Sequence, residues 1–550
     1  MNRMAFILST IALFIGIILF PKIAVQAYSS SSSNNSYISL DNYGAVGDGT
    51  TDNYLPLTNA INDAISKNLP LKIPSGTYYS SKMIGIDGKI RIYCDKTAPA
   101  TIVFRDNVQY GNKPEYWQRG IMTFSGDGLL LENITLQYES NNYTQYTRNM
   151  SSKVGGEGVL LSVVDAANVT LNNVTFCISG TQNPSVTCCW FKSETADIKN
   201  IIINGCTFNH NSSSTVGGSL WLSSHDNAST HLVNIDITNC TFNEYAHDET
   251  MSFWGYNLAN INVSGNTYNY LGSSTFSETF VALGAYENAK SFSNISFSRN
   301  TFNINGHVNT ALQIGNLPST SAISIYGNTF NATIPFDVDF SCIGVFDCGN
   351  AFLTNNTFNI TGGKSISFIL MDRYGSIAVN KAKFSASNSP RCLIVRSRYS
   401  QNYSGSLLRV NNSTFNIAAS DSNRNMPTIQ FPMDSTISIV NTKINTNSSA
   451  IHEIVFQTLS KPAFNTGNSS VILSSVSTDA DVIFSFKGFD KRKIELTGTT
   501  LGSLYCNFDG ASSAVDTFII SDCSFTSFYL NSKEDNLSSL EKYVNNLSTK

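Results

Sequence analysis

The chain carries little charge for its length. Only 13% of its 550 residues are Asp, Glu, Lys or Arg, and the formal net charge at pH 7 is −4. A protein that binds nucleic acid needs a basic surface to neutralise phosphates, so nucleic acid is excluded as an expected partner. The polar residues are instead mostly Asn, Ser and Thr. Their uncharged side chains suit hydrogen bonds to sugars, although the same composition also suits the turns of a stacked repeat.

The chain also lacks a metal-binding cysteine motif. It has 11 Cys but no C-x-x-C pair, and the adjacent Cys188 and Cys189 do not have the spacing of a zinc site. No cofactor is therefore expected. A calcium ion near Asp347 and Asp372 is a weaker alternative, because a hard cation needs about six or more oxygen ligands.

Long apolar runs are absent except at the N-terminus. There Arg3 is followed by the apolar residues 4–20, and the segment ends in small residues at Ala27. This pattern predicts a secretory signal peptide over residues 1–27 and a secreted or cell-surface protein, with an uncleaved membrane anchor as the alternative. No membrane partner is expected after cleavage. The Ser-rich residues 28–38 predict a flexible linker.

Beyond the linker, the main feature is an irregular repeat of strand patterns. In each copy, alternating apolar residues are followed by a polar turn and then by a Thr and an aromatic residue. Such alternation predicts a β-strand, and the variable spacing indicates one structural turn interrupted by loops of different length. The copies are residues 168–176, 200–208, 234–242, 260–268, 294–302, 322–330 and 351–358, with weaker copies at 407–415, 436–444, 493–501 and 517–525.

A second set of strand patterns lies between these copies, for example at residues 217–225, 248–255 and 277–286. Two or more strands in every turn predict an all-β fold, a parallel β-helix or solenoid, over residues 39–530. With parallel strands about 4.8 Å apart, roughly 12 turns make a rod about 60 Å long. A solenoid can exceed the usual domain size because each turn packs only on its neighbours.

Stacked copies predict columns of similar side chains. An Asn column just before the Thr predicts a ladder of amides that satisfies the polar groups of the turns, and the aromatic column predicts a buried stack. Cys206 and Cys240 replace Asn on two neighbouring turns, where a disulfide and two buried free thiols are both open. The columns are Asn266, Asn300, Asn328 and Asn356, and Phe208, Phe242, Tyr268, Phe302, Phe330 and Phe358.

Both ends of a solenoid need a cover. Residues 51–65 have apolar Leu57 and Ile61 on one helical face, so they predict a capping helix at the N-terminal end. Residues 531–550 are predicted to form a C-terminal cap or tail, and a helix over residues 533–549 is one form it can take.

Two short motifs near the N-terminus carry a family resemblance. YGAVGDGTTD at residues 43–52 is followed by the expected helix, an apolar strand and IPSGTY at residues 73–78. This order resembles the N-terminal signature of the pectate-lyase superfamily group that includes tailspike-like and polygalacturonase-like proteins. The resemblance implies that the β-helix is right-handed and that its activity is directed at glycans.

The best candidate catalytic residues lie in HDET, residues 247–250. Alignment of residues 248–250 with 277–279 places Glu249 near Glu278, and two close carboxylates raise one pKa, as a general acid requires. A solvated strand entry is the structural alternative. The candidate catalytic residues are His247, Asp248, Glu249 and Glu278, and the candidate sugar-binding residues beside them are Trp221, His225, Asp226 and Trp254.

A second candidate patch contains paired Arg and Tyr residues. Arg373 and Tyr374 align with Arg398 and Tyr399 on the next turn. Arginine binds carboxylates in a bidentate manner, so this patch predicts binding of an acidic sugar such as a uronate. A structural ladder of Asp and Arg salt bridges is the alternative.

The chain departs from the polygalacturonase-like pattern. Residues 306–308 read GHV and not G-H-G, and residues 396–398 read RSR and not R-I-K. Pectin hydrolysis by that mechanism is therefore not expected. The favoured interpretation is a secreted enzyme that cleaves an extracellular polysaccharide in a lateral groove around residues 221–280, a hydrolase in preference to a lyase. A glycan-binding adhesin and a tailspike-like rod are the alternatives, and the residues do not decide between monomer and trimer.

Overall fold

The computed structural model describes residues 36–549 with internal gaps. The gaps are residues 110–119, 140–157, 180–185, 212–217, 225–228, 246–249, 271, 273–277, 285–290, 316, 319, 391, 398–406, 420–428, 433–435, 447–452 and 458–469. The predicted signal peptide over residues 1–27 lies outside the described residues. Within them, no helix is long and apolar enough to cross a membrane.

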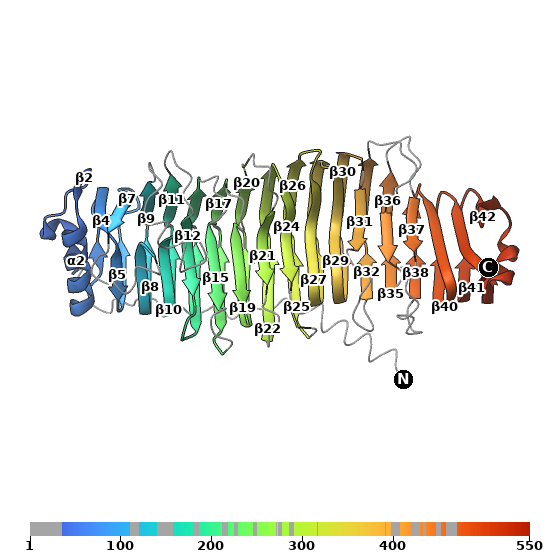
Figure 1. The fold of residues 1–550 in the computed structure, drawn as a ribbon, viewed down its shortest axis with the longest axis horizontal. Helices are drawn as coiled ribbons and strands as arrows, with labels where there is room; N and C mark the ends of the chain where they lie inside the picture. Colours follow the sequence, from blue (N-terminus) through green and yellow to red (C-terminus); the bar gives the residue numbers. More distant parts are fainter. Residues whose placement is uncertain are drawn as a thin grey trace.

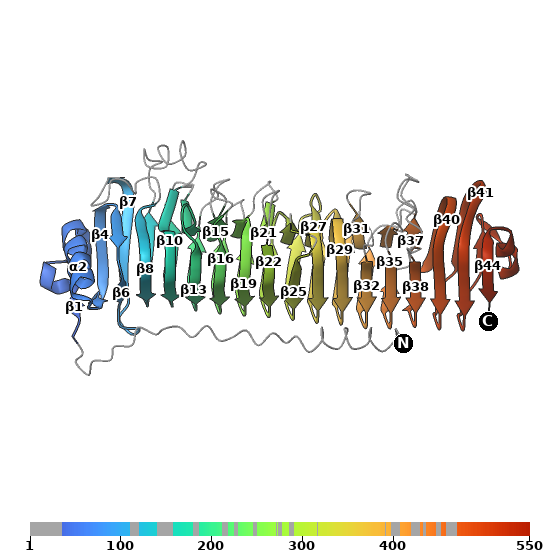
Figure 2. The same ribbon diagram turned by 90° about the horizontal axis from the view of Figure 1, so that it is seen from below.

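The described strands wind into a parallel solenoid. Figures 1 and 2 show an elongated body whose strands run across its long axis, with α2 (Tyr54–Lys67) at the N-terminal end. Every strand pairing among the described residues is parallel except the one between β42 (Phe528–Leu530) and β43 (Lys533–Glu534). The predicted all-β β-helix is therefore confirmed.

Each turn contributes to three ladders of strands. The first ladder contains β5 (Ile84–Asp87), β8 (Met122–Glu132), β10 (Gly158–Asn172), β12 (Val186–Lys192), β15 (Leu220–Ser224), β18 (Met251–Gly255), β21 (Glu278–Gly284), β24 (Val308–Gly315), β27 (Asp339–Thr354), β29 (Ser365–Asn380), β31 (Cys392–Ser397), β34 (Ile429–Pro432), β37 (Glu453–Gln457), β40 (Asp481–Thr497), β41 (Leu504–Ser521) and β42. The long strands bend and also enter the second ladder, so that β10 pairs with β12 and then with β13 (Ile198–Asn204).

The second ladder follows the first along the chain. Besides the shared long strands it contains β1 (Ile38–Ser39), β3 (Leu71–Lys72), β6 (Ile90–Tyr93), β13, β16 (Leu232–Thr238), β19 (Asn257–Ser264), β22 (Ser291–Ser298), β25 (Ala322–Tyr326), β32 (Leu407–Asn411), β35 (Thr436–Val440), β38 (Ser470–Ser474) and β44 (Val544–Thr549).

The third ladder is a separate sheet of 15 strands. They are β2 (Asp48–Asp52), β4 (Gly76–Lys82), β7 (Ala100–Gln109), β9 (Ile134–Glu139), β11 (Thr175–Ser179), β14 (Thr207–His210), β17 (Thr241–Glu244), β20 (Thr267–Tyr270), β23 (Thr301–Asn305), β26 (Thr329–Ile334), β28 (Thr357–Gly362), β30 (Lys383–Ser389), β33 (Thr414–Ala419), β36 (Lys443–Thr446) and β39 (Ser477–Thr478). The first four of these strands precede the first recognised copy of the repeat.

The predicted aromatic column is confirmed. Phe208 and Phe242 stack with ring centroids 4.8 Å apart, and Phe302 and Phe330 stack at 4.4 Å, in both cases with nearly parallel planes. In-register parallel pairing places each ring about one strand spacing, ~4.8 Å, from the next. The column is buried inside the solenoid, so these aromatic residues belong to the core and not to a binding site.

The predicted Asn ladder is also confirmed. The Nδ2 atoms of Asn266, Asn300 and Asn328 donate to the Oδ1 atoms of Asn300, Asn328 and Asn356 at 3.0 to 3.1 Å. Cys206 and Cys240, which continue this column, are buried free thiols, as are most of the other cysteines. Of the two alternatives for these cysteines, the structure therefore has the free thiols.

The two ends of the solenoid differ from each other. Helix α2 forms at the N-terminal end, and its Leu57 and Ile61 join the buried core; its capping role stays a prediction. The helix expected over residues 533–549 is wrong. The chain forms only the short 3₁₀ helix η4 (Leu537–Lys542), and then β44 pairs in parallel with β41 because its backbone completes the exposed edge of the second ladder.

Candidate functional site

The segment with the predicted catalytic residues lies largely outside the described residues. His247, Asp248, Glu249, His225 and Asp226 fall in the gaps at 225–228 and 246–249. The backbone of Glu278 begins β21. What the structure does describe is the set of strands to which these segments attach.

The register of these strands corrects the predicted alignment. The backbone N–H of Thr250 donates to the carbonyl of Phe280 at 2.9 Å, and Met251 pairs with Val281. The offset between these turns is thus 281 − 251 = 30, whereas the alignment of residues 248–250 with 277–279 assumed 29. By the described offset Glu278 corresponds to Asp248 and not to Glu249.

The same register places the described strand ends to which the two predicted halves of the site attach. Leu220 pairs with Met251 and Ser224 pairs with Gly255. The segment with His225 and Asp226 follows Ser224, while the segment with His247 to Glu249 precedes Met251. The two segments therefore attach to opposite ends of the first ladder, about 13 Å apart at ~3.3 Å per residue. The residues of both segments lie outside the described part of the chain, so their shared neighbourhood stays a prediction.

Tryptophans gather on the outer side of the first ladder. Trp190 pairs with Trp221, and the two rings meet edge to face with centroids 5.6 Å apart. Trp190 Nε1 donates to Ser223 Oγ at 2.7 Å, and Ser223 pairs with Trp254 on the next strand. The sequence analysis missed Trp190, although alignment of CCWF with SLWL would have placed it in the column of Trp221.

Two hydroxyls beside this cluster are buried. Ser252 pairs with Trp221, and its Oγ has no hydrogen-bond partner among the described residues; the same holds for Thr250 Oγ1. Buried hydroxyls normally have a partner. The Trp cluster with these hydroxyls combines apolar ring surface and hydrogen-bonding capacity, which are the two requirements of a sugar site.

The register also corrects the Arg patch. Phe346 pairs with Asp372 and Cys348 with Tyr374, so that Asp347 lies opposite Arg373. Met371 pairs with Ser397, an offset of 26 residues where the predicted alignment of Arg373 with Arg398 assumed 25. Asp372, not Arg373, therefore corresponds to Arg398, which lies outside the described residues.

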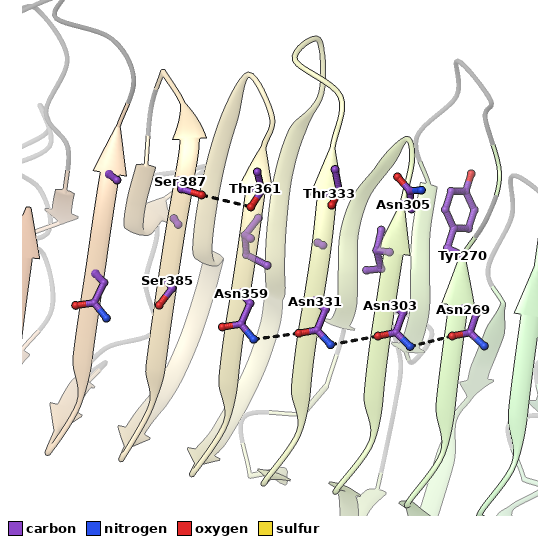
Figure 3. A pocket seen from close by; sticks show the side chains of 16 residues that line it. Asn269, Tyr270, Asn303, Asn305, Asn331, Thr333, Asn359, Thr361, Ser385 and Ser387 are labelled. Carbon is purple, nitrogen blue, oxygen red and sulfur yellow. Dashed lines mark hydrogen bonds between the residues drawn. The ribbon is translucent and has the colours of Figure 1, made fainter. Parts of the chain in front are cut away.

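The described residues contain one further surface that the sequence analysis did not predict, a groove on the 15-stranded sheet. We call it the Asn groove. It runs across β20, β23, β26, β28, β30 and β33 and encloses about 590 Å³ (Figure 3). Its lining residues are Asn269, Tyr270, Asn303, Ile304, Asn305, Asn331, Ala332, Thr333, Asn359, Ile360, Thr361, Ser385, Ala386, Ser387, Asn416 and Ala418.

A second Asn ladder, distinct from the buried one, runs along the floor of the Asn groove. Nδ2 of Asn303 donates to Oδ1 of Asn269 at 2.9 Å, Asn331 donates to Asn303 at 3.2 Å, and Asn359 donates to Asn331 at 3.0 Å (Figure 3). An amide has two N–H donors and two acceptor lone pairs. Asn303 and Asn331 each use one donor and one acceptor on their neighbours, so each keeps one donor and one acceptor for a ligand.

The sequence of the strands explains this surface. In T-F-N, as at residues 301–303 and 329–331, the central Phe is buried and the Thr and Asn on either side of it point outward. The sequence analysis interpreted the buried Phe and the Asn before the Thr, but not the Asn that follows the Phe. Reading the same period-two alternation for the outward positions would have predicted the Asn ladder.

The Asn groove has no charge. Among the described lining residues there is no Asp, Glu, His, Lys or Arg. It therefore lacks the carboxyl pair that glycoside hydrolysis uses and the cations that bind uronate or phosphate. Nor do the described residues include any cluster of three or more metal-ligating side chains. The groove is equipped to form neutral hydrogen bonds.

The class defined by these observations is a parallel β-helix with a lateral groove. Residues 37–270 match the family model described as "Rhamnogalacturonase A/epimerase, pectate lyase-like". The predicted resemblance to the pectate-lyase superfamily is thus confirmed for residues 37–270. The match ends in β20, the first strand of the Asn groove. No curated protein sequence matches the chain.

Several solved structures are similar in fold. PfbA, a surface adhesin of Streptococcus pneumoniae, has 14% identity over 66% of this chain and 91% of its own, with a TM-score of 0.40. The catalytic unit of a GH87 α-1,3-glucanase from Streptomyces thermodiastaticus has 11% identity over 93% and 72%, with a TM-score of 0.36. An exopolygalacturonase from Thermotoga maritima has 12% identity over 91% and 93%, with a TM-score of 0.31. At these values the similarities carry no argument about function.

Proposed function

We propose that this protein is a carbohydrate-active β-helix that recognises an extended, uncharged polysaccharide along the Asn groove. The observation that carries the proposal is the lining, in which amides and hydroxyls recur on successive turns without a charged group among the described residues. The pectate lyase-like match of residues 37–270 supports a glycan as the class of ligand.

The dimensions of the groove fit a chain-like ligand. Six neighbouring strands, from β20 to β33, line it, and five spacings of about 4.8 Å give a length of ~24 Å. A linear glycan of several sugars spans this length. Because the four successive turns from Asn269 to Asn359 present the same amide in the same orientation, neighbouring sugars there meet equivalent hydrogen-bonding groups.

A blocking substitution tests the proposal. Thr333 lies exposed on the wall of the groove, and Asn211 occupies the equivalent exposed position four turns earlier, outside the groove. Thr333→Tyr is expected to abolish retention of the protein on galactomannan and dextran in affinity electrophoresis, while Asn211→Tyr leaves it unchanged. Equal retention of both variants, or no binding of any neutral polysaccharide by the wild type, contradicts the proposal.

Cleavage of a polysaccharide at the first ladder is the second candidate function. It is supported by the Trp190 and Trp221 pair and by the unpartnered hydroxyls of Ser252 and Thr250, next to the segment with His247, Asp248 and Glu249. In this proposal a carboxyl group of Asp248 or Glu249 acts as general acid, and Trp221 and Trp254 hold the sugar. Arg373 and Arg398 stay proposed contacts for an acidic sugar.

Product release tests the cleavage proposal. The wild type should release reducing ends from a polysaccharide, and the double variant Asp248→Asn/Glu249→Gln should not; Glu278→Gln is tested separately. Ultraviolet absorbance of an unsaturated product would change the reaction class from hydrolase to lyase. Equal release by the wild type and the double variant would contradict this site. Release by Thr333→Tyr at the wild-type rate separates the cleavage site from the Asn groove.

The place of action follows from the N-terminal segment. The predicted signal peptide over residues 1–27 supports a secreted or cell-surface protein, where extracellular polysaccharides are the available ligands. Mass determination of the secreted protein tests it, since cleavage after Ala27 gives a mature chain that begins at Tyr28.

A further inference from the structure

The Asn ladder of the groove is interrupted at one strand. Asn359 pairs with Ser385, and Ser385 pairs with Asn416. The amide ladder resumes beyond the interruption, where Nδ2 of Asn445 donates to Oδ1 of Asn416 at 2.7 Å. Within the described part of the groove, Ser385 is the one residue of this column that lies between two asparagines without being an amide itself. Its hydroxyl forms no hydrogen bond to Asn359 or Asn416 there.

The interruption leaves two amide groups directed at each other. Asn359 donates its Nδ2 to Asn331, so its Oδ1 lies on the opposite side, towards Ser385. Asn416 accepts at its Oδ1 from Asn445, so its Nδ2 also lies towards Ser385. Oδ1 of Asn359 and Nδ2 of Asn416 therefore face each other across a gap of two strand spacings. Within the described residues, neither atom has a hydrogen-bond partner in the gap.

The surrounding side chains make room at this gap. The small residues Ser387 and Ala418 line the groove beside Ser385, where the preceding turn carries Thr361. Between neighbouring members of an uninterrupted ladder, Nδ2 and Oδ1 lie about 3 Å apart. A missing amide adds one strand spacing of ~4.8 Å, so Nδ2 of Asn416 and Oδ1 of Asn359 lie ~8 Å apart.

We infer that the gap at Ser385 is a subsite for one neutral sugar, which bridges Asn359 and Asn416 through two adjacent hydroxyl groups. One hydroxyl accepts from Nδ2 of Asn416 and the other donates to Oδ1 of Asn359. Two hydrogen bonds of ~2.8 Å and a similar distance between adjacent hydroxyl oxygens sum to about 8 Å, which matches the gap. This inference rests on the proposed function and specifies its ligand as a polysaccharide with vicinal diols.

The polarity of the ladder gives the subsite its selectivity. The ladder amides Asn303, Asn331, Asn359 and Asn445 all donate in the same direction along the solenoid. The donor and acceptor ends of the gap are therefore not equivalent, and the diol binds in one orientation. A uronate finds no cation in the described lining, and its carboxylate would lose hydration without compensation. Linear β-1,3-glucan lacks vicinal diols in its internal sugars and cannot form the bridge.

Completion of the ladder tests the subsite. Ser385→Asn supplies the missing amide, fills the gap, and repeats a residue that the neighbouring turns accommodate, so the variant is expected to fold. Cys177→Asn is the matched control, because Cys177 pairs with Asn209 at the other end of the same column, outside the groove. Binding of galactomannan, dextran, linear β-1,3-glucan and polygalacturonate is measured by affinity electrophoresis and isothermal titration calorimetry.

The wild type and Cys177→Asn should bind galactomannan and dextran in preference to linear β-1,3-glucan and polygalacturonate. Ser385→Asn should bind them about tenfold or more weakly, because the ligand loses both hydrogen-bond partners, with an unfolding midpoint at or above that of the wild type. Unchanged binding by Ser385→Asn, or equal binding of β-1,3-glucan by the wild type, overturns the subsite and leaves groove recognition standing. If Thr333→Tyr loses binding while Ser385→Asn binds as the wild type does, the groove binds glycan but the subsite at Ser385 is wrong. If the wild type binds no glycan, the proposed function itself is refuted.

Discussion

The side-chain carbonyl of Asn356 accepts two hydrogen bonds from Asn328, one from the backbone N–H at 2.9 Å and one from Nδ2 at 3.0 Å. Asn300 makes the same two bonds to Asn328, at 2.9 and 3.0 Å. The Nδ2 of Asn328 also donates to the carbonyl of Phe297 at 3.0 Å. Each buried amide thus satisfies polar groups of its own turn and of the adjacent turn, and consecutive turns are coupled through side chains as well as strands.

The first prediction concerns this coupling. Asn328→Ala leaves two donors of Asn300 and the carbonyl of Phe297 unsatisfied in the core, at a cost of about 1–3 kcal/mol for each buried group. We expect a loss of roughly 3 kcal/mol or more in the free energy of unfolding, measured by urea denaturation. Asn331→Ala, in the solvated ladder of the Asn groove, is the control and should lose about 1 kcal/mol. Equal losses would mean that the buried ladder adds no special stability.

The second prediction concerns a buried pair between β14 and β17. Nδ1 of His210 lies 2.6 Å from Oε1 of Glu244, Nε2 of His210 lies 2.8 Å from the carbonyl of Val186, and Ser219 Oγ donates to Oε2 of Glu244 at 3.0 Å. Both side chains are fully buried. Glu244→Ala removes the buried partner of His210 Nδ1 and of Ser219 Oγ, so it should cost about 3–5 kcal/mol.

A double substitution checks that reasoning. His210→Leu/Glu244→Met removes both polar groups and fills the space with apolar atoms, so its loss in urea denaturation should be smaller than the sum of the single losses. Additive losses would show that the two side chains stabilise the fold independently.

Much of the fold was predictable from the sequence because the repeat reports the core directly. Phe208, Phe242 and Tyr268 recur after the same strand pattern, and parallel in-register pairing turns that recurrence into a stack. The C-terminal end could not be predicted in this way. Residues 533–549 have polar, helix-compatible composition, but the open edge of β41 offers backbone partners that only tertiary structure supplies.

The candidate site was less predictable for a related reason. Register between turns decides which side chains meet, and loops of variable length hide it: the offset from Met251 to Val281 is 30 residues and that from Met371 to Ser397 is 26. An error of one residue in each alignment changed the proposed neighbours of Glu278 and of Arg373. The Asn groove gave no such signal in the sequence, because its described lining is uncharged and sequence motifs for catalysis and sugar binding consist mainly of charged and aromatic residues.

The third prediction addresses helix α2 as a cap. Leu57 is fully buried in the core, whereas Leu55 in the same helix is 64% exposed. Leu57→Ala should destabilise the protein by about 2–5 kcal/mol, and Leu55→Ala should have little effect. If the helix covers the end of the solenoid, limited proteolysis of Leu57→Ala should cut first in the N-terminal turns. Initial cleavage elsewhere would contradict a capping role.

The fourth prediction concerns the cysteines. All 11 are free thiols, and only Cys177 and Cys523 are not fully buried. Burial raises the pKa of Cys348 and of Cys392 to about 12, and the thiolate is the reactive form. At most two thiols should react with a thiol reagent in the native protein at pH 8, and all should react after denaturation without reductant. Fewer reactive thiols after denaturation would reveal a disulfide.

The last prediction is a pH dependence centred on Asp165. Burial raises the pKa of its carboxyl group, but the hydroxyl of Thr195 and the backbone N–H groups of Ala196, Thr195 and Glu194 outweigh burial and lower the pKa below its usual value. These donors lie 2.6 to 3.0 Å from the carboxylate oxygens. A folded pKa below the unfolded value of about 3.9 means that the ionised carboxylate stabilises the protein above that pH. The stabilisation is lost as the pH falls through the folded pKa.

Asp165→Asn removes the charge and keeps the shape and a side-chain oxygen, at a left-handed position (φ 50°) that Asn tolerates. Its melting temperature should therefore lie below that of the wild type at pH 7, and the difference should shrink at a pH of about 3 and lower, where the wild-type carboxylate begins to protonate. Scanning calorimetry of both proteins across this range measures the difference. A gap that stays constant or widens towards acid would show that the four hydrogen bonds do not depend on the charge of Asp165.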